Sequence, residues 1–487
     1  MSNAANKNAE ALNALFGDAS LASRLTSTRI AVVTPSDDLS PAGALLARVT
    51  ADTLARLWPN IDFYGFGAEQ QLTVSLSATQ SGGAPTDGLA IRWAPPYNCV
   101  IAIGCRAPTE ADYVLQVGAD NWTAEFGPDA HCGNSPNPIG PAFAAAMVSA
   151  QVFRQVFMSE LSGMDLAPLD PCTIDVRTLF DASHLEVGPL NLGQTYMFGV
   201  GAVSHSFVWL LEQWSEPAFG ELHLVDQDGY GHSNGQRYAF MRPQDEGATK
   251  VDMIRNRLAI AHPRLSTTPH AVDLNTFCAN QGYDKPLQRA ITGLDSAESR
   301  RHVALKLPET TINMWTEGVR IGAGRYLPGD GGACLACDYL EKLNTPLDEV
   351  AEISRETGIR PDLVRNLLDS GRGLTQQEAA MISAKRNVSP AQIIGEPLRS
   401  VMPTLCATGR LQLPNSPEIV DVPFAFASLF AGIAGFIMLL KDCTGSSVGS
   451  YGWTQHIFKK PTPHMHRALC TRDGCVCCAE MKHINSQ

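Results

Sequence analysis

Two cysteine pairs carry the most specific chemical signal in this sequence. Cys334 and Cys337 form one Cys-x-x-Cys motif, in "ACLAC", and Cys475 and Cys478 form another, in "RDGCVCC". Four thiolates complete the tetrahedral coordination of zinc and leave no position for water, which is typical of a structural site. Because the pairs lie far apart in sequence, the zinc is expected to fasten the C-terminus back onto the domain that contains the first pair.

Other cysteines compete for these roles. Cys470 and Cys477 lie close to the second pair, and we prefer Cys475 with Cys478 as the ligands. The start of the chain, "MSNAANKNAEALNALF", lacks the basic and then apolar stretches of a signal peptide, so we expect a cytoplasmic protein with reduced thiols. The 13 cysteines are therefore expected to be zinc ligands, a nucleophile and buried fillers, and not a disulfide framework.

A glycine-rich turn followed by a strand that ends in a carboxylate indicates a nucleotide site. In "YMFGVGAVSH", Gly199 and Gly201 allow a tight turn, and Ala202 begins a helix whose N-terminal N–H groups favour phosphate. Asp226 ends the next strand, in "ELHLVDQD", where a carboxylate accepts hydrogen bonds from ribose hydroxyls. NAD and ATP sites share these features, but Ser204 stands where the NAD fingerprint has its third glycine.

The residues after Asp226 favour ATP. Asp228 and Asn234 lie where the chain turns back over the nucleotide, and Arg237 follows them in "SNGQR". An arginine neutralises phosphate through two parallel hydrogen bonds, which lysine cannot form. Lys250 comes next, at the predicted start of a helix, a position suited to a phosphate contact. NAD enzymes have no fixed need for this ordered set of residues.

Asp295 completes the candidate site. It ends the predicted strand "AITGLD", and a carboxylate at the carboxyl edge of a parallel sheet points into the crevice where ligands bind. At that place it could hold Mg²⁺ against the phosphates. A role as N-cap of the helix that follows, in "SAESRR", suits the same residue equally well.

These residues need a parallel sheet to bring them together, and the sequence predicts two such units. At 487 residues the chain is too long for a single core. Strands alternate with helical patterns in both halves, which is typical of α/β domains with mostly parallel sheets. The first unit is expected to close with a small-residue-rich helix at 140–157, and the second with a similar helix at 422–441. This shared order of parts fits an internal duplication.

Only the second copy has the glycine-rich turn and the aspartate. At the matching place the first copy has "VVTPSDDLSPAG", whose proline and acidic pair do not suit phosphate, so we expect a non-catalytic half. The apolar stretch 422–440 is nearly long enough to span a bilayer. The soluble character of the rest of the chain favours a buried helix, and we expect no membrane contact.

A segment inside the second unit, 345–397, predicts several short amphipathic helices. Its pattern resembles a helix-turn-helix domain of the phage-repressor type. Its acidic and basic residues roughly balance, whereas a DNA-binding module needs a basic face. The net charge of −12 for the whole chain also argues against a surface built mainly for nucleic acid. We therefore favour a small module for protein contacts.

Taken together, these motifs resemble the ThiF/MoeB family and its relatives, the activating enzymes of ubiquitin and ubiquitin-like proteins. The likeness covers about 194–340, and again 400–441 and 470–478. In that family a "GxGGxG" turn, an Asp, an "SNLxRQ" motif, a Lys and a later Asp bind and orient ATP with Mg²⁺. The corresponding residues here are Gly199–Ser204, Asp226, Ser233–Arg237, Lys250 and Asp295. The chain departs from the family pattern at three of its positions: Ser204 for Gly, Gly235 for Leu and Tyr238 for Gln.

The resemblance implies a two-step reaction. In the first step, with Arg237 and Asp295 as catalytic residues, the C-terminal glycine carboxylate of a ubiquitin-like protein attacks the α-phosphate of ATP. The acyl group then passes to a cysteine as a thioester, and on to a conjugating enzyme. Cys406, in "VMPTLCATGR", lies where the family has this nucleophile, and Arg410 could lower its pKa.

Two other cysteines, Cys278 and Cys443, are weaker candidates for the nucleophile. Cys443 follows the closing helix, and Cys278 precedes Asp295 in the sequence.

The resemblance also implies the domain organisation. The expected parts are an inactive adenylation half at 1–160, a connector at 161–190, an active adenylation domain at 191–344, a helical insertion at 345–400, and a catalytic-cysteine crossover with the closing helix and zinc-binding C-terminus at 401–487. Such a pseudo-dimer within one chain resembles the activators of bacterial antiphage conjugation operons. Arg24 or Arg29 of the first half is then a candidate for the arginine that reaches ATP from the partner half.

Three other functions stay open at this point. The first is a sulfur-carrier-protein adenylyltransferase, in which Cys406 is incidental or forms a persulfide. The second is a zinc-bearing scaffold or DNA-binding regulator that uses the helical insertion. The third is an NAD dehydrogenase, which Ser204 and the ordered Arg, Lys and Asp residues disfavour. The sequence also leaves open whether two chains associate.

Overall fold

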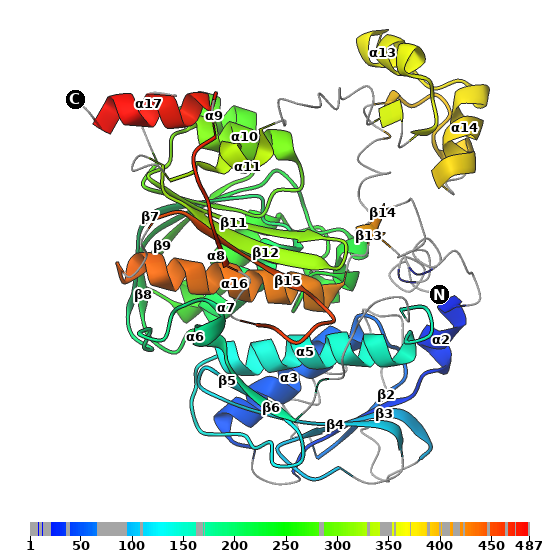
Figure 1. Ribbon diagram of the computed structural model, residues 1–487, viewed down its shortest axis with the longest axis vertical. Coiled ribbons are helices and arrows are strands. Elements are labelled where there is room, and N and C mark those ends of the chain that lie inside the picture. The colour runs from blue at the N-terminus through cyan, green and yellow to red at the C-terminus, as the bar shows by residue number, and fades with distance from the viewer. Residues whose placement is uncertain are drawn as a thin grey trace.

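The computed structural model describes residues 8, 12, 21–35, 39–65, 95–107, 111–161, 169, 171–281, 287–328, 332–340, 353–354, 357–370, 372–386, 390–398, 401, 410–412, 419–421, 424–445, 449–462, 466–472 and 474–485. They form two α/β units, each built on a mixed sheet that contains a run of parallel strands. In Figure 1 the first unit is blue to cyan and lies below the second. The predicted α/β class with two mostly parallel sheets is confirmed.

The first unit is built on a six-stranded sheet in the order β2-β1-β3-β4-β5-β6. Four strands run parallel, and β5 and β6 extend the sheet with antiparallel pairings. The strands are β1 (Ile30–Val33), β2 (Ile61–Tyr64), β3 (Tyr97–Ile103), β4 (Ala111–Asp120), β5 (Thr123–Phe126) and β6 (Cys172–Asp175). The helices are α2 (Ala22–Ser27), α3 (Pro41–Ala55), α5 (Ile139–Val156) and α6 (Val176–Leu179). β6 and α6 lie in the stretch predicted as a connector.

The second unit is built on an eight-stranded sheet in the order β16-β15-β12-β11-β10-β7-β8-β9. The five strands from β11 to β9 in this order run parallel, and β12, β15 and β16 extend the sheet through antiparallel pairings. The strands are β7 (Leu190–Phe198), β8 (Ala218–Val225), β9 (Leu265–His270), β10 (Arg289–Thr292), β11 (Thr310–Glu317), β12 (Arg320–Tyr326), β15 (Tyr451–His456) and β16 (His466–Ala468). The α-helices are α7 (Ala202–Glu212), α8 (Lys250–Ala261), α9 (Leu274–Gln281), α10 (Ala297–Leu305), α11 (Leu335–Tyr339), α16 (Ala425–Cys443) and α17 (Val476–Asn485).

The two sheets share the order of their central strands. In the second unit the sheet runs β9-β8-β7-β10-β11-β12, which is the doubly wound order 3-2-1-4-5-6. In the first unit β2-β1-β3-β4-β5 follows the same order, without a third strand outside β2 among the described residues. In such sheets ligands bind at the carboxyl edge where the strand order reverses, and in the second unit this place lies between β7 and β10.

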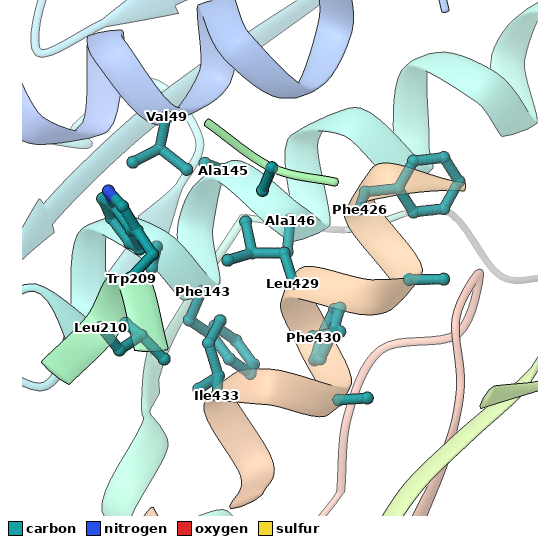
Figure 2. Close-up of a cluster of buried hydrophobic side chains, with 14 of the residues drawn as sticks. Val49, Phe143, Ala145, Ala146, Trp209, Leu210, Phe426, Leu429, Phe430 and Ile433 are labelled. Carbon is teal, nitrogen blue, oxygen red and sulfur yellow. The ribbon is translucent and has the colours of Figure 1, made fainter. Parts of the chain in front are cut away.

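Four helices join the two units. α5 packs against α3 and α16, and α16 packs against α7, so that the two closing helices lie side by side (Figure 1). Phe143 of α5 meets Phe430 of α16 edge to face, with ring centroids 5.0 Å apart. Further buried side chains from all four helices surround this pair in Figure 2: Val49, Ala145, Ala146, Trp209, Leu210, Phe426, Leu429 and Ile433. The two units therefore share one continuous hydrophobic core.

The apolar stretch expected to be a buried helix is α16. Among the described residues it is the one helix long and apolar enough to cross a bilayer, yet it is almost wholly buried inside the protein. Its small residues allow close packing, because a Cβ at Gly435 would lie 2.2 Å from Sδ of Met314. A Cβ at Gly432 would lie 2.8 Å from the backbone nitrogen of Phe207 in α7.

The helical insertion forms a small core of its own. Its described helices are α13 (Pro361–Ser370), α14 (Gln376–Arg386) and the short 3₁₀ helix η4 (Pro390–Gln392), and Figure 1 shows α13 and α14 apart from both sheets. Ile359, Leu367 and Ile382 are buried within it. A short hairpin of β13 (Arg410–Gln412) and β14 (Ile419–Asp421) follows in the chain.

Candidate functional site

The glycine-rich turn lies at the carboxyl end of β7. Gly199 has a φ of +79°, and a Cβ there would lie 2.8 Å from Cδ2 of Leu294, so glycine is required. Gly201 is the N-cap of α7 and offers no capping side chain, which leaves the first N–H groups of the helix, from Ala202 onward, open to an anion. Ser204 is buried, and its hydroxyl donates to the Gly199 carbonyl at 2.6 Å. Ser204, which stands where the family pattern has glycine, therefore stabilises the turn through this hydrogen bond.

Asp226 lies directly after β8, beside this turn. Its carboxylate accepts hydrogen bonds from the backbone N–H groups of Val200 at 2.7 Å and of Asp228 at 2.8 Å. Its side chain is 10% exposed. A carboxylate has about four acceptor positions, so two remain that can accept from ribose hydroxyls.

Lys250 is the first residue of α8, and its buried ammonium group faces the same carboxylates. Nζ lies 2.8 Å from Asp228 and 3.7 Å from Asp226. Burial works against the charged form of Lys250, but the attraction of Tyr238, Asp226 and Asp228 outweighs it and raises the pKa. The ammonium group therefore stays charged at neutral pH, as a phosphate contact requires.

The "SNGQR" motif forms a compact loop over this edge, with the 3₁₀ helices η2 (His232–Gln236) and η3 (Pro243–Asp245). The Asn234 side chain accepts from the backbone N–H of Gly231 at 2.9 Å, and so closes the loop. The guanidinium of Arg237 lies 5.9 Å from the ring centroid of Tyr238. Within the described part of the chain, no carboxylate lies within ion-pair distance of Arg237, which leaves its charge available for a ligand.

Asp295 lies between β10 and α10, at the same edge of the sheet, and its side chain is exposed. The alternative prediction, that Asp295 caps the helix that follows it, is wrong. Ser296 is the N-cap of α10, and its hydroxyl accepts from the backbone N–H of Ser299 at 3.0 Å. Among the described residues no side chain pairs with Asp295. An exposed carboxylate of this kind suits a hard cation such as Mg²⁺, which prefers oxygen ligands.

The structure brings the turn, the loop and the segment after β10 into contact. A Cβ at Gly201 would lie 3.6 Å from the Gly293 carbonyl and 4.0 Å from the Tyr238 hydroxyl. Tyr238 stands where the resemblance leads one to expect glutamine, and Nζ of Lys250 lies 5.8 Å from its ring centroid. Tyr238 therefore lines the candidate site, although it departs from the family pattern.

The two arginines suggested as reaching ATP from the first half are engaged inside that half. Arg24 pairs with Glu160 at 2.8 Å, and Arg29 pairs with Asp62 at 2.9 Å. A different arginine, Arg56, which directly follows α3, contacts the "SNGQR" loop and was not predicted from the sequence. The signal available was an Asp and an Arg four residues apart, Asp52 and Arg56, within the apolar helix "ADTLARLW".

The four predicted zinc ligands lie together. The Sγ atoms of Cys334, Cys337, Cys475 and Cys478 are all buried and within 4.8 Å of one another. Cys334 and Cys475 are 3.4 Å apart, and Cys337 and Cys478 are 3.5 Å apart. Tetrahedral zinc with Zn–S bonds of about 2.3 Å requires sulfur separations of about 3.8 Å, so the cluster fits zinc with small adjustments.

The cluster joins two helices from distant parts of the sequence. Cys334 is the N-cap of α11, and Cys475 directly precedes α17. A hydrogen bond from Cys334 lowers the pKa of Cys337 to about 5, and the backbone N–H of Arg472 helps. The same hydrogen bond raises the pKa of Cys334, and burial raises that of Cys475 to about 12. Of the competing cysteines, Cys470 is exposed and Cys477 is buried, and neither belongs to the group of four.

The candidate nucleophile Cys406 and its neighbour Ala407 lie outside the described residues. The two weaker candidates are described. Burial raises the pKa of Cys278 in α9, and it raises the pKa of Cys443 at the end of α16 to about 11. Both thiols are therefore protonated at neutral pH, which disfavours them as nucleophiles.

Comparisons with known proteins give distant relatives. No family model matches the chain. It is 29% identical over 398 residues to the uncharacterized protein y4jF of Sinorhizobium fredii, across 78% of this chain and 75% of the relative. It is 26% identical over 181 residues to the Nedd8-activating enzyme E1 catalytic subunit of Drosophila melanogaster, across 33% of this chain and 39% of that protein.

Among solved structures, Escherichia coli MccB with ATP aligns over 75% of this chain and 97% of MccB, at 12% identity and a TM-score of 0.36. PaaA aligns over 55% of this chain and 65% of its own, at 14% identity and a TM-score of 0.31. Scores this low do not bear on fold or function. The sequence comparison shows that a third of the chain is similar to part of an E1 catalytic subunit.

Proposed function

We propose that this chain activates the C-terminal carboxylate of a ubiquitin-like protein with ATP and passes the acyl group, as a thioester on Cys406, to a ubiquitin-conjugating-type enzyme. The observation that carries the proposal is the pair Asp226 and Lys250 beside the open N-terminus of α7. The pair lies at the carboxyl edge of the sheet, where the strand order reverses. A ribose acceptor, a buried cation and free helix N–H groups at one place suit a nucleoside triphosphate.

The residues of the site have distinct roles in this proposal. Asp226 accepts from the ribose hydroxyls, and the turn of Gly199, Gly201 and Ala202 lies against the phosphates. Lys250 and Arg237 neutralise the charge that builds up on the α-phosphate. Asp228, which holds Lys250 in the structure, orients its ammonium group, and Asn234 keeps the loop closed.

The proposed first step breaks one bond and forms one. A carboxylate oxygen of the substrate bonds to the α-phosphorus, and the bond from that phosphorus to the bridging oxygen breaks, with pyrophosphate as the leaving group. Asp295 would hold Mg²⁺, which neutralises phosphate charge when bound. In the second step the Cys406 thiolate bonds to the acyl carbon, and AMP leaves with the electron pair of the broken bond.

The sequence likeness to a Nedd8-activating E1 catalytic subunit supports this class of reaction. The zinc ligands would be Cys334, Cys337, Cys475 and Cys478, and the metal would contribute folding energy and hold α17 against α11. The predicted domain boundaries, the cytoplasmic location and the antiphage context belong to the same proposal.

A sulfur-carrier-protein adenylyltransferase shares the first step and differs only in the fate of the adenylate. Outside the zinc cluster, Cys477 is the one described thiol of the second unit with a lowered pKa, and it owes this to a hydrogen bond with the cluster residue Cys334. The choice between these functions therefore rests on Cys406. Thioester formation therefore requires a separate experiment.

The first experiment measures thermal unfolding of the purified chain with ATP and Mg²⁺, with NAD, and with no ligand. A ligand that binds only the folded state, at about 100 times its Kd, adds about 2.7 kcal/mol to the free energy of unfolding. We expect stabilisation by ATP with Mg²⁺ that is weaker in Asp295→Ala. Stabilisation by NAD alone, or by neither ligand, would contradict the proposal.

The second experiment tests the relay. The chain is incubated with ATP, Mg²⁺ and a panel of ubiquitin-fold proteins that end in glycine, and the products are separated without reducing agent. We expect one panel member to support ATP–pyrophosphate exchange and to form an adduct that thiols cleave. Cys406→Ala should keep the exchange and lose the adduct, whereas an adduct that persists would point to another cysteine.

A further inference from the structure

Two buried charged residues at the C-terminal end of α3, Asp52 within it and Arg56 as its C-cap, connect the first unit to the candidate ATP site. Asp52 and Arg56 lie one helical turn apart, with side chains 3% and 1% exposed. The Asp52 carboxylate accepts from Nε and Nη2 of Arg56 at 2.9 and 2.8 Å. An ion pair with so little access to water is costly to bury unless further hydrogen bonds satisfy both charges.

The pair finds such hydrogen bonds on one loop of the second unit. Arg56 donates to the backbone oxygens of Gly235 and Met241, the latter at 3.0 Å. Asp52 accepts from the backbone N–H of Phe240 at 2.9 Å. These three backbone groups bracket the loop 235–241, which contains Arg237 and Tyr238.

The loop is held in a conformation that its own sequence does not favour. Phe240 has a φ of +62°, a region that bulky residues rarely occupy without support from their surroundings. Its ring stacks on Trp209 of α7, with centroids 4.2 Å apart, and faces the guanidinium of Arg48 of α3. The first unit thus supplies both the hydrogen bonds and part of the packing that keep this backbone in place.

We propose that Asp52 and Arg56 are positioning residues for nucleotide binding. The first unit fixes the loop that presents Arg237 to the phosphates and places Tyr238 between Gly201 and Lys250. This inference rests on the proposed function, because it assigns the phosphates of ATP to that side of the loop. In this proposal the first unit, which has no candidate nucleotide-binding residues, positions a loop that the second unit uses in the reaction.

The test compares Arg56→Lys with a matched control, Arg325→Lys. Arg325 is also a buried arginine, pairs with Asp442 at 2.6 Å and donates to the Gly449 carbonyl, but it lies at the opposite, amino edge of the second sheet. The Kd values for ATP with Mg²⁺ and for adenosine are measured by calorimetry. Hydrogen exchange is followed in the peptide that contains the loop.

We expect Arg56→Lys to weaken ATP binding by about tenfold or more, a change of about 1.4 kcal/mol. Adenosine has no phosphates, so its Kd should change by less than about twofold, whereas a general loss of folding would weaken both ligands alike. Exchange at the Phe240 N–H should become faster in Arg56→Lys. Arg325→Lys should change neither the Kd ratio nor the loop exchange.

An Arg56→Lys chain with unchanged loop exchange and an unchanged ratio of the two Kd values would overturn the inference. If Arg56→Lys loses its cooperative unfolding transition, Asp52→Asn takes its place, since the amide oxygen can still accept from Phe240. If the wild-type chain binds neither ATP nor adenosine, the proposed function fails. The exchange comparison then still decides whether the pair holds the loop.

Discussion

The two units present nearly the same backbone at the carboxyl edges of their sheets, but with different side chains. In each, the residue after the first strand donates its backbone N–H to the end of the second strand: Thr34 to Tyr64 at 2.9 Å, and Gly199 to Val225 at 3.0 Å. The residue that follows the second strand is Gly65 in one unit and Asp226 in the other.

The helix that begins at each edge also differs in how its N-terminus is satisfied. α3 begins with Pro41, which has no N–H, and the Ser40 side chain accepts from Gly43 at 3.3 Å. Cys132 packs over this end, because a Cβ at Gly43 would lie 3.2 Å from its Cβ and one at Gly104 would lie 3.1 Å from its Sγ. α7 has no such cover among the described residues. In the first unit, protein groups therefore cover the N-terminus of the helix at this edge. In the second unit, the N-terminus of α7 is open to an anion.

The comparison shows how two units with the same order of central strands can differ at the edge where ligands bind. The first unit retains its sheet and its closing helix α5, which packs against α16. It also carries the charged pair at the end of α3 that contacts the loop of the other unit. Under the proposal above, the first unit supports the site of the second and has none of the candidate nucleotide-binding residues at its own edge.

The largest expected effect on stability comes from removing a ligand of the zinc cluster. The described residues of the first unit contain no such cluster. Structural zinc contributes on the order of 10 kcal/mol of apparent binding free energy in small domains, so its loss should lower the Tm and release α17. We expect Cys337→Ser to reduce the zinc content, measured by mass spectrometry of the metal, from one ion per chain to almost none. Cys470→Ser is the matched control and should keep the ion. A chain that holds no zinc when wild type would refute the assignment.

The next effect concerns the carboxylate that distinguishes the two edges. Asp226→Ala removes the acceptor for Val200 and the proposed acceptor for the ribose. Hydrogen bonds to charged groups are worth about 1.5–3 kcal/mol, so the Kd for ATP should rise by roughly 10- to 100-fold. Asp62→Ala, which removes a carboxylate from β2 of the first unit, should leave the Kd unchanged. Equal effects of both variants on ATP binding would show that the edges do not differ as described.

A third variant attempts to restore the lost residue. Gly65→Asp places a carboxylate where the first unit has glycine, but Gly65 has a φ of +83° and a Cβ there would lie 2.2 Å from the Thr34 carbonyl oxygen. We expect a loss of about 1–3 kcal/mol in the free energy of unfolding and no second nucleotide site. Urea denaturation and ATP titration measure these quantities. Binding of a second ATP would mean that this one residue accounts for the difference in nucleotide binding between the two edges.

The smallest effect is a pH dependence of stability that arises from a buried histidine of the second unit. His205 of α7 is fully buried, and burial, with Arg257 and Arg56 nearby, lowers its pKa well below 6.5. The unfolded chain therefore binds a proton below pH 6.5 that the folded chain does not, and stability is full above pH 6.5 and falls as the pH is lowered. The expected loss is on the order of 1 kcal/mol per pH unit.

His205→Gln should reduce this slope, because it removes the buried imidazole. The matching position of α3 in the first unit is Ala44, which does not titrate. Three other histidines also have lowered pKa values: His223, His270 and His456. They contribute equally to the pH dependence of stability in the wild-type chain and in His205→Gln. The difference between the two slopes therefore isolates His205. Identical slopes would mean that His205 is protonated without cost in the folded chain.

The sequence predicted those parts of the site that depend on local pattern. Alternation of strands and helices placed Gly199 and Asp226 at one edge, because parallel strands end on the same side. The cysteine spacing gave the four residues that cluster. Asp295 was placed correctly at this edge, but its competition with Ser296 for the cap was decided only by backbone geometry.

Features that depend on distant contacts could not be predicted in this way. β5 and β6 extend the first sheet, and β15 and β16 extend the second, through short pairings that carry no strong periodic signal. Arg56 could be recognised as an unusual charge in an apolar helix, but its partner loop lies in the other unit. The engagement of Arg24 and Arg29 within the first unit likewise follows from tertiary packing.

The most direct test of the central claim is the stoichiometry of nucleotide binding by the whole chain. Calorimetric titration with ATP and Mg²⁺ should give one site per chain, and the site should be lost or greatly weakened in Asp226→Ala but kept in Asp62→Ala. Two sites per chain would contradict the functional difference between the two edges. Binding of NAD in place of ATP would contradict the proposed chemistry of the second unit.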